Sequence, residues 1–418
     1  MGNLSRAATK VEGLLSRVTS SGRFIPEIDG LRFIAVITVL LFHLNALTLQ
    51  FYQAHGRSPE GVGHALDMFF RTGFIGVEIF FAISGFILGL PFALQRIRGG
   101  KRVRLPRYFL RRLTRLEPTY FVNMLTLFLL KVVAFYRWEG RPDLRPATML
   151  PHLFASLIYS HNLIYRVGST INNVAWSLEV EVQFYVLAPL ICSLFSVKSR
   201  STRRGALVAL GIGAAVLDYL SLTMGINLGM TLLRCLPFFI VGLLVADVYV
   251  ADWHEQPYRS QGWSWLAVAG CAGMLILART GFVAPELLNG FVVSLKLLIG
   301  HALLALSIAM LFVGTLRGSW ANRILRLRPV VLIGGMCYTI YLYHQSLYHL
   351  LGYWTASRWS WLPYGGFIAV QSLVLLIGCL ALSAVLFVLF EKPFMYPDWP
   401  AKARATLKRW WRVSTSRD

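Results

Sequence analysis

The chain has 418 residues, of which 56% are hydrophobic and 14% are charged, and its mean hydropathy is +0.58. A soluble protein of this length could not cover so much apolar surface, so we expect an all-α polytopic membrane protein. The formal net charge of +22 does not indicate a nucleic-acid partner, because the basic residues fall in alternate loops between apolar stretches.

Hydropathy along the chain predicts a bundle of about ten membrane-spanning helices. The segment 152–165 is apolar but short and contains two histidines, so we expect it to be re-entrant or interfacial. The predicted spans are 33–50, 74–94, 117–135, 176–195, 206–222, 229–249, 264–280, 291–315, 331–351 and 364–390.

The charges of the loops predict that both termini are cytoplasmic. The segment 96–116 carries nine arginines and lysines and no acid. We expect a cytoplasmic arm over 1–28, without a cleavable signal peptide, a membrane domain over 29–392, and over 393–418 a basic tail suited to anionic lipid. The five cysteines lie in or beside apolar runs without ligand spacing, which predicts no metal site.

The first predicted span places two ionisable residues on one helical face. Arg32 and His43 are eleven positions apart, which is close to three full turns and a rise of roughly 16 Å. Arg32, with Asp29 one turn before it, would lie at the cytoplasmic mouth and His43 near the middle of the membrane. An ionisable group at that depth predicts a functional site, although packing and topology alone could also account for the pair.

A basic stripe precedes the third span. Arg104, Arg107, Arg111 and Arg115 are spaced three, four and four residues apart, with Arg112 beside them. Guanidinium groups in one row at a membrane mouth suit a polyphosphate ligand. Anionic lipid headgroups and topology are the alternative explanation.

Acidic and small polar residues mark the second and fourth spans. Glu78 begins the second span and Ser84 lies near its middle, where a small residue permits close helix packing. Glu179 and Glu181 open the fourth span, and their spacing of two points them to different faces. One of these carboxylates could orient an imidazole, whereas headgroup water could simply solvate both.

The ninth span presents Tyr341, His344 and Tyr348 on one face, at spacings of three and four. An aromatic face with a hydrogen-bond donor suits sugar stacking. An interfacial aromatic belt is the alternative.

Together these segments resemble the acyltransferase-3 family of integral membrane O-acyltransferases, in the stand-alone form without a fused esterase-like domain. Glu78 stands where many members carry Asp, and Val182 where a second Glu often follows, so Glu181 is the acid to compare. The shared motifs are an Arg-x10-His pair at Arg32 and His43, GVExFFxxSGF at 76–86, RRxxRxxP from Arg111 to Pro118, WSLxxE from Trp176 to Glu181, and YxxYLxHQ from Tyr338 to Gln345.

The resemblance implies transfer of an acyl group, usually acetyl, from cytoplasmic acyl-CoA to a hydroxyl. It implies acyl-CoA as donor substrate and no permanently bound cofactor. The implied acceptor is a glycan or lipid-linked saccharide outside a bacterial cytoplasmic membrane, or else a small hydroxylated natural product. The alternative interpretation is a saccharide or lipid transporter, because membrane spans with buried ionisable residues are also typical of transporters. No inverted repeat, which many transporters contain, is visible in the sequence.

By the same resemblance His43 is the catalytic base or a transient acyl carrier. Arg32 would stabilise charge near the thioester, and Glu181 is a candidate partner for the imidazole. The acyl-CoA-binding residues would be Arg111, Arg112, Arg115 and Ser84. Support of the site or of the acceptor is expected from Asp29, Glu78, Trp176, Ser177, Tyr341 and His344.

Overall fold

A computed structural model describes residues 12–18, 24–137, 145–226, 228–280, 282, 291–396 and 399. Within these residues the fold is helical, as predicted, apart from one isolated bridge between Ser260 and Gly318. Most of the predicted tail over 393–418, including all of 400–418, and much of the N-terminal arm lie outside the described residues. The helices are α2 (Pro26–Ala54), α3 (Gly61–Phe70), α4 (Gly76–Arg98), α5 (Leu105–Arg137), α6 (Pro146–Leu157), α7 (His161–Tyr165), α8 (Trp176–Ile191), α9 (Arg200–Thr223), α10 (Leu232–Ala251), α11 (Gln261–Arg279), α12 (Phe291–Arg317), α13 (Ser319–Leu325), α14 (Arg328–Gly335), α15 (Cys337–Trp359), α16 (Tyr364–Leu386) and α17 (Lys392–Met395), with short segments η1 (Arg71–Ile75), η3 (Asn173–Ala175), η4 (Cys192–Ser196) and η5 (Phe387–Glu391).

Across the described ranges, nine helices or joined helices are long and apolar enough to cross a membrane. The predicted span 331–351 corresponds mainly to α15, whose 23 residues have the length for a tenth crossing. Its tyrosines and histidines lower its hydropathy below that of the other nine. The expectation of a polytopic helix bundle is confirmed.

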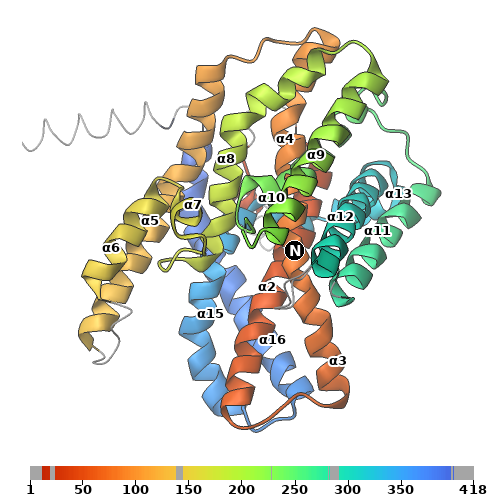
Figure 1. Ribbon diagram of the computed structural model, residues 1–418. Coiled ribbons are helices and arrows are strands. Elements are labelled where there is room, and N and C mark those ends of the chain that lie inside the picture. The colour runs from red at the N-terminus through yellow and green to blue at the C-terminus, as the bar shows by residue number, and fades with distance from the viewer. Residues whose placement is uncertain are drawn as a thin grey trace, which may run out of the picture.

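The bundle has two distinct ends in Figure 1. The connections α4–α5 and α8–α9 lie at the top, and the connections α2–α3 and α15–α16 lie at the bottom. The basic segment 96–112 and the arginines that begin α9 are both at the top. We call this end of the molecule the basic end.

The segment 152–165 does not cross the bundle. It contains the end of the 12-residue α6 and the whole of the five-residue α7, and a turn at Tyr159 with φ of 55° joins them. Both helices are too short to span a bilayer. The side chains of Phe154 and Ile158 are exposed, which suits contact with lipid at the interface.

Helices α4 and α10 cross at close range because each contributes a glycine. A Cβ at Gly85 would come within 3.0 Å of the Phe239 backbone, and one at Gly242 would come equally close to Ala82 and Phe86. Small residues at such crossings let helix backbones touch. This crossing packs α4, which lines the candidate site, into the apolar core.

Replacing Gly242 by alanine is therefore expected to lower the thermal unfolding midpoint in detergent, because overpacking typically costs about 1–3 kcal/mol. Gly213 on α9 is the matched control, because a Cβ added there meets nothing within 4 Å. At that exposed helical position alanine should leave the midpoint unchanged or raise it. Equal effects of the two substitutions would contradict the packing account.

Candidate active site

A wide cavity of about 1110 Å³ opens at the basic end. It lies among the first turns of α5, the last turns of α4 and the start of α2. Three residues of the predicted basic stripe line it, Arg104, Arg107 and Arg111, together with the adjacent Arg112. The side chain of Arg115 lies outside the described part of the chain. The further cationic residues that line this cavity are Arg17, Lys101 and Arg102.

A narrow cavity of about 100 Å³ continues from the wide one toward the core. The two share Ile87 and Arg112 as lining residues, so Arg112 stands where the wide cavity becomes the narrow one. The guanidinium of Arg112 lies 5.9 Å from the ring centres of both Tyr108 and Tyr185. These contacts hold its positive charge at the junction.

Arg32 lines the narrow cavity and is held by its neighbour on α2. Its Nη1 is hydrogen-bonded to Asp29 Oδ1, and Arg17 Nη1 donates to the same oxygen at 2.9 Å. Asp29 is buried and Arg32 is nearly so. One carboxylate thus fixes two guanidinium groups beside the passage, which keeps this part of the site cationic.

Glu181 also lines the narrow cavity, but it does not meet the imidazole. Its Oε1 accepts hydrogen bonds from Ser84 Oγ at 2.5 Å and from Tyr185 Oη at 2.6 Å. Within the described residues no hydrogen bond joins Glu181 to His43, and Oε1 is held by two hydroxyl groups, one on α4 and one on α8. Glu179 faces away, as its spacing predicts, and accepts from the Asn162 backbone N–H at 2.8 Å.

The partner of His43 is a second histidine, His344, on α15. Its Nε2 lies 3.1 Å from His43 Nδ1, and its own Nδ1 lies 2.7 Å from the Tyr341 carbonyl oxygen. A carbonyl only accepts, so the neutral His344 carries its proton on Nδ1 and presents Nε2 as an acceptor. His43 Nδ1 also faces the Val39 carbonyl at 3.1 Å, so this nitrogen is the donor to both.

This hydrogen-bond network leaves the neutral His43 with an unprotonated Nε2. A ring nitrogen with a free lone pair can take a proton or attack a carbonyl carbon. None of the hydrogen bonds found in the described residues involves this nitrogen. The imidazole is half-buried, and Phe42 packs edge-on against it.

Tyr341 and Ser177 are joined by a hydrogen bond at the wall of the narrow cavity. Their hydroxyl groups are 2.7 Å apart, and both residues line the cavity whereas His43 does not. The Tyr341 ring lies 5.8 Å from the ring of His344. Tyr341 is therefore the lining residue that contacts the histidine pair.

Besides His43 and His344, two predicted residues line neither cavity, namely Glu78 and Trp176. Glu78 is in the first turn of α4 with its Oε2 buried and unpartnered, and Arg234 is its cationic neighbour. Trp176 begins α8, packs edge-on against Phe81 and accepts from Asn162 through its carbonyl. Both residues support the helices that carry the site and do not line it.

Several lining residues were not predicted. Tyr185, Tyr338 and Cys337 contribute to the narrow cavity, and Arg17 to the wide one. Tyr185 follows Glu181 by four positions, which places it on the same helical face and could have indicated it. For Arg17 no sequence signal existed, because only the fold brings the arm before α2 against Asp29.

Comparison with protein families places this architecture in a known class. The model of an acyltransferase domain matches residues 25–391, and the chain therefore belongs to the acyltransferase-3 family of membrane proteins. The match covers both cavities except Arg17, Val18, Phe24 and Met395.

Two curated relatives are similar to the chain. The O-acetyltransferase OatA of Staphylococcus aureus is 26% identical over 350 residues, which are 78% of this chain and 51% of the relative. The peptidoglycan O-acetyltransferase OatA of Listeria monocytogenes is 30% identical over 204 residues, 47% of this chain and 29% of the relative. The chain thus spans about half the length of these relatives at most. No solved structure matches.

Proposed function

We propose that this protein transfers an acetyl group from acetyl-CoA to a hydroxyl of a glycan or lipid-linked saccharide. The basic end faces the cytoplasm, where the donor is present, and the acceptor arrives from the opposite end. The protein then resides in a bacterial cytoplasmic membrane with both termini inside. The observation that carries the proposal is the cationic wide cavity that narrows at Arg112 into a cavity lined by Tyr341, whose ring lies 5.8 Å from that of His344, the partner of His43.

The donor fits this path in size and charge. The phosphates of CoA bind the guanidinium groups of Arg107, Arg111 and Arg112, which match phosphate geometry and charge. The uncharged pantetheine arm enters the narrow cavity, whose walls include Phe80, Ile83 and other apolar side chains. For the thioester to reach the imidazole, the hydrogen bond between the hydroxyl groups of Ser177 and Tyr341 breaks.

In the reaction, His43 Nε2 takes the proton of the acceptor hydroxyl as its oxygen attacks the thioester carbon. The carbon–sulfur bond breaks, and the CoA sulfur leaves with the proton that the imidazole received. The hydroxyl of Tyr341 stabilises the negative charge that develops on the carbonyl oxygen. Arg32, roughly 16 Å from His43 along α2, supplies positive charge beside the passage that the donor enters. Attack by Nε2 itself, with an acetyl-imidazole intermediate, uses the same free lone pair. His344 fixes the tautomer in either route.

Binding of acetyl-CoA to purified protein in nanodiscs tests the donor assignment. A ligand at 100 times its Kd should stabilise the protein by about 2.7 kcal/mol, seen as a higher unfolding midpoint. The midpoint should rise with acetyl-CoA and with CoA, but far less with S-acetylpantetheine, which lacks the phosphates. A saccharide transporter predicts no rise with CoA, so an unchanged midpoint would overturn the proposal.

A further inference from the structure

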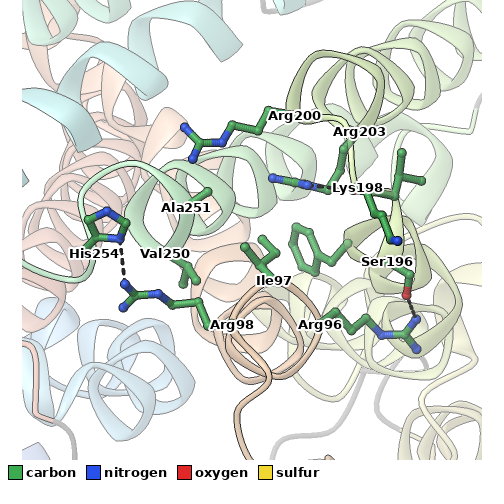
Figure 2. Close-up of a pocket in the computed structure, with 12 residues that line it drawn as sticks. Arg96, Ile97, Arg98, Ser196, Lys198, Arg200, Arg203, Val250, Ala251 and His254 are labelled. Carbon is green, nitrogen blue, oxygen red and sulfur yellow. Dashed lines mark hydrogen bonds between the residues drawn. The ribbon is translucent and has the colours of Figure 1, made fainter.

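A second cationic cavity, of about 350 Å³, lies at the basic end between α4, η4, α9 and α10. It shares no lining residue with the wide or the narrow cavity. Figure 2 shows cationic side chains around its rim and apolar ones near its centre. The cationic or basic lining residues are Arg96, Arg98, Lys198, Arg200, Arg203 and His254, and none of the twelve lining residues is acidic.

The charges of this cavity are only partly neutralised by nearby acids. Arg203 pairs with Asp247, Arg200 lies 2.8 Å from Asp252, and Arg98 Nη1 lies 3.4 Å from Glu255 Oε1. Arg96 is hydrogen-bonded to Ser196 Oγ at 2.5 Å, and this bond leaves its charge unbalanced. Lys198 is exposed and has no acidic partner within the described residues. The cavity therefore keeps a surplus of positive charge.

The turn after α10 holds an imidazole at the rim. His254 and Glu255 are consecutive non-glycine residues with positive φ angles of 51° and 65°, a conformation that costs energy and is often found where a ligand is held. The turn is closed by the Glu255 N–H, which donates to the Tyr249 carbonyl at 2.9 Å. It places His254 Nδ1 2.7 Å from Arg98 Nη2.

This contact fixes which ring nitrogen of His254 carries the proton. Arg98 can only donate, so Nδ1 accepts and the neutral ring carries its proton on Nε2. The rim then presents N–H donors from guanidinium, ammonium and imidazole groups above a floor of Ile97, Phe195 and Val250. Such a set matches the oxygens of a phosphate, and the apolar floor strengthens the attraction by lowering the local dielectric.

We propose that this cavity, distinct from the donor site, binds a phosphate group, carried by an anionic lipid headgroup or by a soluble phosphate compound. It would bind its ligand whether or not acetyl-CoA occupies the wide cavity. The inference does not depend on acyl transfer.

The test compares the full-length protein with the double variant Arg98→Gln and Lys198→Gln. Unfolding midpoints are followed in phosphatidylcholine nanodiscs during titration with inorganic pyrophosphate, and separately in nanodiscs with increasing phosphatidylglycerol. At least one of the two titrations should raise the unfolding midpoint of the wild-type protein, also at saturating CoA. The titration that does so shows whether the phosphate comes from a soluble compound or from a lipid headgroup. In the double variant the apparent Kd should be at least about tenfold weaker, since two charge-assisted contacts are lost.

Arg323→Gln with Arg326→Gln is the matched control, because both arginines are exposed and line none of the three cavities. Lys198→Gln alone serves as a second variant that breaks no ion pair of the described structure. An equal loss in the control, no response in either arm, or a response that CoA abolishes would overturn the proposal. A rise in the unfolding midpoint that is kept in the control but weakened in both pocket variants would support the proposal.

Discussion

Replacing His43 by alanine is expected to lower the rate of acetyl transfer by about 10²- to 10⁴-fold, the range that a positioned acid–base group contributes. The physical reason is the free Nε2, which the hydrogen bonds of Nδ1 to Val39 and His344 leave as the proton acceptor. Transfer of labelled acetyl from acetyl-CoA, measured in membranes with the saccharide acceptor, reports the rate. The KM for acetyl-CoA should change little, because His43 does not line the donor cavities.

His344 provides the control for this assignment. His344→Leu removes the acceptor that fixes the tautomer of His43, whereas His344→Gln retains a side-chain oxygen that can accept from Nδ1. The glutamine variant should therefore keep more activity than the leucine variant, at equal donor KM. Full activity of His43→Ala, or equal activities of the two His344 variants, would contradict the proposed role of the pair.

Replacing Arg111 and Arg112 together by glutamine is expected to raise the KM for acetyl-CoA about 10- to 100-fold, since a hydrogen bond to a charged group is worth about 1.5–3 kcal/mol. Both side chains line the wide cavity, and Arg112 also lines the narrow one. The maximal rate should fall much less, because the two arginines do not reach the reacting atoms. Initial rates over a range of acetyl-CoA concentrations separate the two parameters.

A truncated donor shows whether the arginines act on phosphate. S-Acetylpantetheine carries the thioester without the phosphates, so wild type and the double variant should use it with similar KM values. Arg326→Gln, outside both donor cavities, should leave the KM for acetyl-CoA unchanged. If the double variant raises the KM for S-acetylpantetheine as much as the KM for acetyl-CoA, the substitutions damage the fold and do not act through a lost phosphate contact.

Much of the fold could be predicted from the sequence, because long apolar segments report membrane helices directly. The helical spacing of Arg32 and His43 held because α2 is unbroken from Pro26 to Ala54. The span around 331–351 was harder to place, since Gly334 and Gly335 end α14 and a new helix begins at Cys337. Hydropathy alone misses such breaks, because it averages over them.

The site was predicted less completely, because its contacts join distant parts of the chain. The basic stripe at the start of α5 was a local pattern, and three of its arginines line one cavity as the spacing suggests. The pairing of His43 with His344 spans 301 positions, so no helical periodicity could show it. Glu181 was the predicted partner for the imidazole, and the described hydrogen bonds join its Oε1 to Ser84 and Tyr185.

In the proposed mechanism, donor and acceptor meet at His43 from opposite ends of the bundle. The decisive measurement follows acetyl transfer across the membrane. It uses inside-out vesicles that expose the basic end, with the saccharide acceptor enclosed and labelled acetyl-CoA added outside. We predict that label appears on the enclosed saccharide with the wild-type protein and not with His43→Ala. If label appears only on saccharide added on the same side as acetyl-CoA, or does not appear at all, donor and acceptor do not meet at His43 from opposite ends.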